Sequence, residues 1–381
     1  MRRPFALLLA LGLASHGLAQ QPRPASTPPP AAAIGDKDDV VESGPEDLPA
    51  GDCFSPGQTR SRLVVARTRI ERFAVPVVDI HSHAYAETGK QVADWVALMD
   101  RIGVRTSVIL TGETGAKFQE LVARYAGAHP GRFAMAAGME QAGVDEPDYG
   151  QRLRRAVRAD VAAGAVALGE LTDKGRGLVR VGERAYFIDD PRFDPLWDEA
   201  GRIGIPVFVH IGEPAAFYDA ADGSNELRRS ANWSLYGKGT PGFAGMIEKF
   251  ERVLSRFPGT RFVAVHAFNL ANDLGQVGRL LDRHPNVQVD FAARMWELAR
   301  QPFSARRFFT AYPNRILFGT DNDPVFGMYA AHVRQLETED EWFWPADSEW
   351  WRGYGMNLPT ATLRRIYVEN PEALLRRGQA P

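Results

Sequence analysis

The sequence predicts an α/β fold of the (β/α)8 or TIM-barrel type, with long loops after its fifth and eighth strands. Short apolar runs alternate with amphipathic segments from about residue 63 onward, which is the pattern of a parallel barrel. No internal repeat and no linker interrupts this region, so we expect a single domain. An open, doubly wound sheet is the competing architecture, but it usually carries a glycine-rich turn after its first strand, where this chain has HSH.

Eight apolar runs are short and rich in Val, Ile, Leu, Ala or Phe, as expected of strands that are buried on both faces. Between them, residues 92–103 and 243–259 show helical patterns, and Gly103 and Gly259 stand where these two helices are expected to end. The predicted strands cover residues 75–80, 106–110, 132–138, 165–170, 205–210, 261–266, 287–290 and 316–321.

The segments 211–242 and 322–360 are long connections, and loops of this length in a compact domain tend to be functional or disordered. Both are rich in aromatic residues, which disordered segments usually lack. We therefore expect ordered lids over the barrel mouth, with packing against each other or against a neighbouring subunit as the alternative. The aromatic residues are Phe217, Tyr218, Trp233, Tyr236, Trp342, Phe343, Trp344, Trp350, Trp351 and Tyr354.

The N-terminal region predicts an exported protein. Residues 1–19 combine two arginines, a short apolar run and small residues, which is typical of a secretory signal peptide that is cut after Ala19. The apolar run is too short to span a bilayer, so we expect no membrane anchor. We interpret residues 20–62, rich in proline and alanine, as a flexible leader and residues 63–381 as the barrel domain. The expected location is the periplasm or the cell exterior.

Composition restricts the partners of the protein. The net charge is −2 and no basic stripe is present, so neither nucleic acid nor an anionic membrane is an expected partner. The single cysteine, Cys53, excludes an intrachain disulfide, so the apolar core must hold the fold together. A small molecule is the expected partner, and a homo-oligomer is compatible with the sequence.

Six side chains that can bind a metal fall at the ends of predicted strands. In a parallel barrel the carboxyl ends of the strands meet at one rim, where the active sites of such barrels lie. Alternate residues of a strand share a face, so the two histidines of HSH can point into the mouth together, with Asp79 below them accepting an imidazole N–H. The six side chains are His81, His83, Glu170, His210, His266 and Asp321.

Taken singly, each of these residues has an ordinary explanation. A buried structural histidine accounts for His210 or His266, a solvated strand end for Glu170, and a helix N-cap for Asp321. Their conjunction at strand ends favours a metal site. Neutral imidazoles and carboxylates suit a divalent ion, with zinc favoured and manganese or iron as alternatives. Such an ion activates water and polarises a carbonyl group, and a nearby carboxylate or imidazole can move the proton.

The stretches DIHSH, VFVH, VAVHAFN and ILFGTD, in this order and spacing, resemble the amidohydrolase superfamily, in particular its amidohydrolase family 2 branch. The stretch from FAARMWELARQPFSARRFF through ILFGTD to YVENPEALL also resembles that branch, so the resemblance covers about residues 75–375.

This resemblance implies roles for the candidate residues. His81, His83 and His210 are implied as metal ligands, and Asp321 as a contact of the metal or its water that acts as the base. His266 is implied as a second acid/base or a further ligand. Glu170 resembles a strand-four carboxylate that bridges two metals in some members, so one or two ions are implied.

The resemblance also implies an activity, which is hydrolysis of a small cyclic ester (a lactone) or amide by activated water. A metal-dependent, non-oxidative decarboxylase of a small carboxylated substrate is the alternative. Arg294 is a candidate to hold a substrate carboxylate by a bidentate contact, with Lys174 and Arg176 as further candidates and a structural salt bridge as the other explanation. A barrel that binds a ligand without turnover is the third hypothesis. It predicts loss of a metal ligand or of the base, whereas all expected positions are filled.

Overall fold

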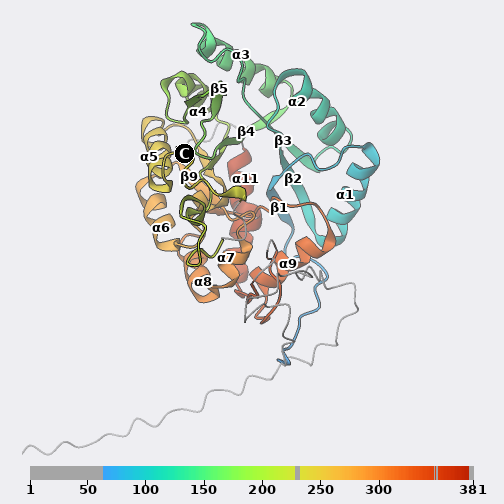
Figure 1. Cartoon of the computed structure of the whole chain (residues 1–381). Coiled ribbons are helices and arrows are strands. Elements are labelled where there is room, and N and C mark those ends of the chain that lie inside the picture. Colours follow the sequence, from blue (N-terminus) through green and yellow to red (C-terminus); the bar gives the residue numbers. More distant parts are fainter. Residues whose placement is uncertain (1–62, 228–231, 347, 349–350, 377–381) are drawn as a thin grey trace, which may run out of the picture.

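The computed structural model describes residues 63–227, 232–346, 348 and 351–376. In this part of the chain, eight parallel strands form one sheet whose spatial order follows the sequence (Figure 1). The predicted TIM barrel is therefore confirmed. The strands are β1 (Val77–Ser82), β2 (Val104–Leu110), β3 (Phe133–Ala137), β4 (Ala165–Asp173), β7 (Val207–Ile211), β8 (Phe262–Ala264), β9 (Val287–Asp290) and β10 (Ile316–Leu317).

Backbone hydrogen bonds between β1 and the residues that follow β10 join the two ends of the sheet and close the barrel. The Ile80 N–H donates to the carbonyl oxygen of Phe318 at 2.9 Å. Past the end of β10, the Asp321 N–H donates to the carbonyl oxygen of His81 at 2.8 Å. Closure therefore brings a residue of the first strand beside one that follows the last.

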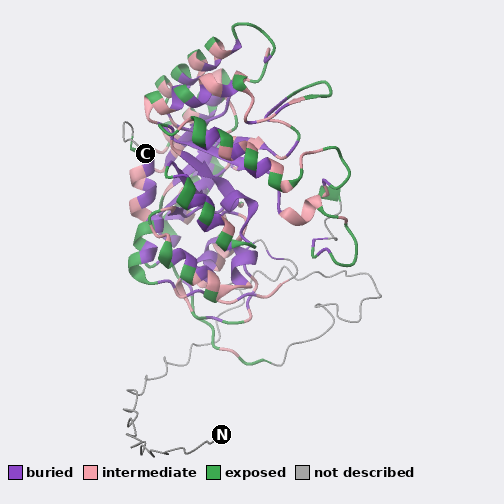
Figure 2. Ribbon diagram, turned by 90° about the vertical axis from the view of Figure 1, so that its left-hand side faces the viewer, coloured by how far each residue is buried: buried purple, intermediate pink, exposed green. Residues whose placement is uncertain are grey.

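Helices surround the barrel, and Figure 2 shows buried strands at the centre with exposed residues on the outer helix faces. No helix among the described residues has the length and apolar character needed to cross a membrane. The helices are α1 (Gly89–Ile102), α2 (Gly115–Val122), α3 (Tyr149–Ala162), α4 (Asp194–Ile203), α5 (Phe243–Arg256), α6 (Leu274–Arg283), α7 (Met295–Ala299), α8 (Pro302–Ala311), α9 (Phe326–Glu337), α10 (Thr360–Arg364) and α11 (Asn370–Leu375).

Local sequence signals explain where α1 begins and ends. The Thr88 and Gln91 side chains each bond to the other's backbone N–H, a capping box that starts the helix earlier than its apolar periodicity indicates. Gly103 ends it in the left-handed conformation at φ +93°, as the sequence predicts. Helix α5 instead ends at Arg256, before the expected Gly259.

Strand side chains divide between two cores because successive residues point to opposite faces. The inner face fills the barrel with small and medium residues, and Phe208 is its largest member. Gly169 allows its strand to lie close against Phe208, since a Cβ there would lie 2.6 Å from Phe208 Cβ. The inner set is Val78, Ile80, Val108, Leu110, Ala136, Ala167, Phe208, Val263, Val265 and Leu317, with Leu374 of α11 packed against it.

Two features of the fold differ from the sequence prediction. A short hairpin, β5 (Val179–Val181) and β6 (Arg184–Tyr186), follows β4, and its alternation is too brief to predict. The predicted long loop after the eighth strand contains α9, most of whose residues are buried. A helix buried on most sides lacks the polar stripe by which periodicity is recognised. The remaining lid there is the part of residues 338–359 that the structure describes.

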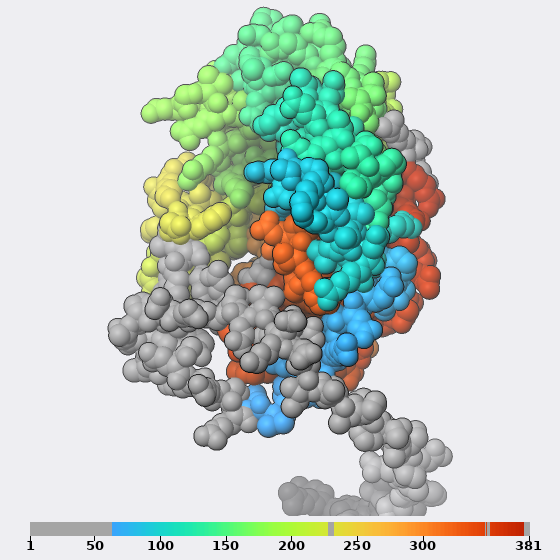
Figure 3. Space-filling view, turned by 90° about the vertical axis from the view of Figure 1, so that its right-hand side faces the viewer, coloured from blue at the N-terminus to red at the C-terminus, as the bar shows by residue number. Residues whose placement is uncertain are grey.

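Helix α9 packs beside α1 on the face shown in Figure 3, where the orange segment lies against the blue-green one. At its end, the Glu337 carboxylate accepts hydrogen bonds from the Ala74 N–H at 3.0 Å and the Tyr367 hydroxyl at 3.1 Å. Burial outweighs these two bonds and raises the pKa of Glu337 from 4.5 to about 7.

We expect this shift to make part of the stability pH-dependent. Between pH 4.5 and about 7 the folded protein holds a proton on Glu337 that the unfolded chain has lost, so this group makes stability fall as pH rises. Glu337→Gln removes the titration. Its thermal midpoint relative to the wild type is therefore expected to be higher at pH 8 than at pH 5. The exposed Glu341→Gln serves as the control, and equal differences at both pH values would contradict the assignment.

Candidate metal centre

The structure brings together imidazole and carboxylate groups at the carboxyl ends of the barrel strands. His83 Nε2 lies 3.1 Å from Asp321 Oδ1, and His81 Nε2 lies 3.8 Å from the same oxygen. His266 Nε2 lies 3.8 Å from Asp321 Oδ2. Three imidazoles from β1, its end and the turn after β8 therefore surround the carboxylate that follows β10.

The other nitrogen of each of these rings is tied to an acceptor. His81 Nδ1 lies 3.0 Å from Asp290 Oδ2, and His83 Nδ1 lies 2.8 Å from the Leu110 carbonyl oxygen. His266 Nδ1 lies 2.7 Å from the Ala292 carbonyl oxygen. Because each acceptor takes an N–H from Nδ1, the neutral tautomer leaves a lone pair on Nε2. All three lone pairs face Asp321, and such an arrangement requires a cation or a proton among them.

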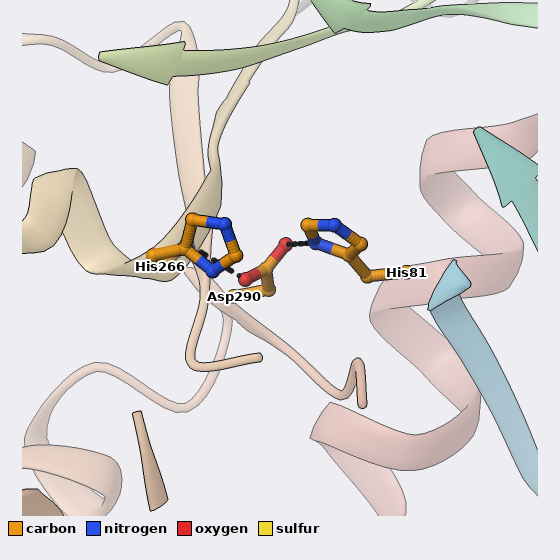
Figure 4. Close-up of side chains that lie close together, drawn as sticks. All are labelled: His81, His266 and Asp290. Carbon is orange, nitrogen blue, oxygen red and sulfur yellow. Dashed lines mark hydrogen bonds and ion pairs between the residues drawn. The ribbon is translucent and has the colours of Figure 1, made fainter. Parts of the chain in front are cut away.

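Asp290, at the end of β9, holds two histidines at once (Figure 4). Its Oδ2 receives the His81 imidazole, and its Oδ1 accepts the backbone N–H groups of His266 at 2.9 Å and Ala292 at 3.1 Å. The sequence predicted that Asp79 would accept the N–H of a histidine ring. Asp79 instead accepts hydrogen bonds from the hydroxyl groups of Thr320 and Ser82. Asp290 was missed, although its position at the end of the VQVD run was a signal.

Replacing Asp290 by asparagine is expected to weaken metal binding by about 10- to 100-fold, because partners that orient metal ligands are typically worth that much. The amide cannot accept from the His81 ring and from two backbone N–H groups in the same way as a carboxylate. Competition with a chromogenic chelator measures the affinity. The exposed Asp94→Asn on α1 should bind as the wild type does, and an unchanged affinity in Asp290→Asn would refute the role.

Glu170, His210 and His266 form a second group beside the first. Glu170 Oε1 lies 2.7 Å from His210 Nδ1 and 3.5 Å from His266 Nε2, and its Oε2 lies 3.6 Å from His83 Nε2. Glu213 Oε2, which the sequence prediction missed, lies 3.8 Å from His210 Nε2. The sequence-predicted residues thus fall into two adjacent groups. The groups meet where Glu170 lies near His83 and where His266 lies near Asp321.

The electrostatics of the site favour a positive charge. Burial lowers the pKa of His81, but the carboxylates of Asp290 and Asp321 outweigh it and raise the pKa to about 10. Burial raises the pKa of Asp321 and of Glu170, but the surrounding imidazoles outweigh it and hold both pKa values below their usual range. The carboxylates are therefore ionised at neutral pH.

The donor set fits a divalent transition metal. Among the described residues, His81 Nε2 and His210 Nε2 are buried and have no hydrogen-bond partner, although such atoms in protein interiors are normally paired. Imidazole nitrogens and carboxylate oxygens are the ligands that zinc and its neighbours take. Three triads of such atoms lie together here: His81, His83 and Asp321; Glu170, His210 and His266; and His81, His266 and Asp290.

Backbone geometry explains why two predicted strands are shorter than expected. Strand β8 ends at Ala264, and His266, Ala267, Phe268 and Asn269 all have positive φ, from 52° to 59°. Asp321 has φ +52°. Non-glycine residues rarely adopt this conformation, and it clusters at functional sites. The chain thus leaves the sheet to turn His266 and Asp321 toward the centre.

A cavity of about 710 Å³ opens above the centre, and His210, His266 and Asp321 line it. Aromatic residues of both lids form part of its wall, as the lid prediction required: Phe217, Trp233, Trp344 and Trp351. Trp351 stacks on Trp296 of α7 with ring centroids 5.1 Å apart. Trp350 lies outside the described residues.

The predicted substrate-binding cations differ in placement. Arg294 lines the cavity, and its guanidinium donates to Asn269 Oδ1 and, at 2.7 Å, to the Ala293 carbonyl oxygen. Lys174 also lines it, with its Nζ 2.7 Å from Glu213 Oε1. Arg176 is exposed and is not among the residues that line this cavity.

The barrel and its rim of histidines and carboxylates define a TIM-barrel enzyme with a candidate metal centre. The amidohydrolase family 2 model, described as amidohydrolase, matches residues 48–377, and the chain therefore belongs to this metal-dependent enzyme family. The family resemblance seen in the sequence is confirmed.

Solved structures resemble this chain at low sequence identity, and the first of them shares its fold. An uncharacterised TIM-barrel protein from Bordetella bronchiseptica is 16% identical with a TM-score of 0.51, covering 79% of this chain and 98% of its own. A 2,6-dihydroxybenzoate decarboxylase in complex with 2,6-dihydroxybenzoate is 15% identical with a TM-score of 0.49, covering 79% and 99%. A 5-carboxyvanillate decarboxylase from Sphingomonas paucimobilis is 11% identical with a TM-score of 0.47, covering 80% and 100%. No curated protein matches significantly.

Proposed function

We propose that this protein is a metal-dependent hydrolase that opens a small cyclic ester or amide. The observation that carries the proposal is the convergence of three Nε2 lone pairs on Asp321 at the floor of the cavity. A divalent ion held there, with zinc favoured over manganese or iron, would activate water and polarise a carbonyl group. The triad of His81, His83 and Asp321 would hold the first ion, and Glu170, His210 and His266 would offer a place for a second.

The residues of the chain supply proton transfer and substrate positioning. Asp321 lines the cavity and is partly exposed to it, so its carboxylate is placed to accept the proton of the attacking water. His266 lies 3.8 Å from Asp321 and is the nearby group that can return a proton to the leaving atom. Burial lowers the pKa of His266, which suits a neutral imidazole in that exchange.

Decarboxylation of a small carboxylated substrate is the second candidate function. The observation that favours it is the guanidinium of Arg294 on the cavity wall, fixed by Asn269 and Ala293 with further N–H groups to bind a carboxylate. In that reaction Asp321 or His266 donates a proton to the carbon that loses carbon dioxide. Binding without turnover is the third candidate, and the complete set of ligands and base disfavours it.

Product analysis separates these functions. Purified metal-loaded protein is mixed with lactones, cyclic amides and carboxylated aromatic acids, and each reaction is followed by acid titration and by carbon dioxide release. Hydrolysis of a lactone yields titratable acid without carbon dioxide, and this is the expected result. Carbon dioxide release from an acid would establish the second function. Stoichiometric binding of a panel compound without any product would establish the third.

We also propose that the protein is exported to the periplasm or the cell exterior, without a membrane anchor or a nucleic-acid partner. The support is the signal-like sequence of residues 1–19, which together with the leader of residues 20–62 and Cys53 lies outside the described residues. Detecting mature protein with an N-terminus at Gln20 in the exported fraction tests this. Light scattering on the same material tests whether it forms a homo-oligomer.

A further inference from the structure

Tyr85 follows the histidine pair of β1, and its hydroxyl reaches the metal centre. The Tyr85 Oη donates to Asp321 Oδ1 at 3.3 Å. Its ring meets the His83 ring edge-on, with centroids 5.9 Å apart, and lies 6.2 Å from the Trp95 ring of α1. The Tyr85 backbone N–H donates to the His83 carbonyl oxygen at 2.9 Å. The side chain is therefore held from several sides with its hydroxyl aimed at Asp321.

The two oxygens of the Asp321 carboxylate have different surroundings. Oδ1 has His83 Nε2 at 3.1 Å, His81 Nε2 at 3.8 Å and the Tyr85 hydroxyl at 3.3 Å. Oδ2 has His266 Nε2 at 3.8 Å. With an ion bound, the imidazole Nε2 atoms would direct their lone pairs at that ion, whereas the Tyr85 phenol is protonated at neutral pH and donates to Oδ1. Tyr85 therefore distinguishes one oxygen of Asp321 from the other.

We propose that Tyr85 is a positioning residue that fixes the rotation of the Asp321 carboxylate and leaves Oδ2, beside His266, to accept the proton. This inference rests on the proposed function, in which Asp321 is the base. A carboxylate has two equivalent oxygens unless its surroundings separate them. A donor on Oδ1 makes Oδ2 the more available acceptor, on the side of the group with which it exchanges protons.

Tyr85→Phe tests the proposal, because it removes one oxygen and retains the ring that contacts His83 and Trp95. The first readout needs no substrate: the visible absorption spectrum of the protein reconstituted with Co²⁺. We expect the variant to bind the same number of Co²⁺ ions as the wild type but to show a changed spectrum, because the Asp321 carboxylate can turn. The matched control is Tyr312→Phe, whose hydroxyl also donates to an aspartate, Asp282, far from the barrel mouth.

The second readout is turnover of a substrate. It is the compound that the wild type converts fastest among the lactones, cyclic amides and carboxylated aromatic acids named above. We expect kcat to fall about 10- to 150-fold in Tyr85→Phe with little change in KM, since hydrogen bonds to charged groups are worth that much. If no panel compound is converted by the wild type, the proposed hydrolase fails, while the Co²⁺ spectra still test Tyr85. A wild-type spectrum and a wild-type kcat in Tyr85→Phe would overturn the inference.

A third comparison separates positioning from a general structural effect. In an Asp321→Asn background, adding Tyr85→Phe should change the Co²⁺ spectrum no further, because the hydroxyl acts through the carboxylate. A further change as large as that in the wild-type background would overturn the inference. Thermal midpoints of all variants are measured alongside. If Tyr85→Phe fails to fold, Tyr85→Leu, which also removes the hydroxyl, takes its place, and a wild-type Co²⁺ spectrum in that variant would overturn the inference.

Discussion

Joint replacement of His81 and His83 by alanine is expected to abolish metal binding at the triad of His81, His83 and Asp321 and, with it, turnover. The two rings present Nε2 toward Asp321 at 3.8 and 3.1 Å, so their loss removes two of the three groups of the first triad. A carboxylate alone cannot hold a transition ion against water. Elemental mass spectrometry on mature protein purified without chelator measures the effect, and the wild type should carry one or two equivalents.

The matched control is His129→Ala, a histidine outside the metal centre whose ring lies 6.5 Å from that of Phe133. That variant should hold as much metal as the wild type. If the wild type itself holds no metal, even after reconstitution, the hydrolase and decarboxylase functions fail together. One equivalent would indicate that only the first triad is occupied, and two would indicate that Glu170, His210 and His266 bind an ion as well.

Asp321→Asn is expected to lower kcat by at least about 100-fold while KM changes little. An amide cannot accept a proton at neutral pH, and general acid–base groups typically contribute 100- to 10,000-fold. Asparagine keeps the shape of the side chain, so the backbone bond from Asp321 N–H to His81 should persist. Steady-state kinetics on the converted panel compound, normalised to bound metal, gives the answer.

Asp323→Asn is the control, because this aspartate is exposed and lies two residues further along the same segment. Its kcat should equal that of the wild type. An Asp321→Asn variant that retains most of its kcat would show that another group, with His266 first among them, takes the proton. The metal content of Asp321→Asn shows in addition whether the carboxylate is needed to retain the ion.

The strand pattern was predictable because strands buried on both faces appear as short apolar runs. The run 287–290 coincides with β9, and the other predicted strands overlap the observed ones. Their ends were less predictable where the backbone turns to positive φ, as at His266 and Asp321. That conformation depends on contacts between distant segments, which local residue preferences do not encode.

The six predicted metal-binding residues do come together, because parallel topology alone places strand ends at one rim. The sequence could not predict which of these side chains contact each other within the site. Which ring nitrogen faces inward depends on the acceptor behind it, such as the Leu110 carbonyl for His83. Asp290 and Glu213 were missed because a lone carboxylate gives no sign of its partner until the fold brings the two together.

The closure of the barrel beside β1 and β10 determines when, during synthesis of the chain, the metal centre can be completed. The Asp321 N–H bonds to His81, so the residues that seal the barrel are neighbours of those that bind the ion. The first triad combines His81 and His83, made early, with Asp321, made near the end. A nascent chain that has not yet emerged past Asp321 lacks a complete centre, however many of its histidines are already outside the ribosome. An ion held by this triad would therefore bind only after Asp321 has been made and the ring of strands has closed.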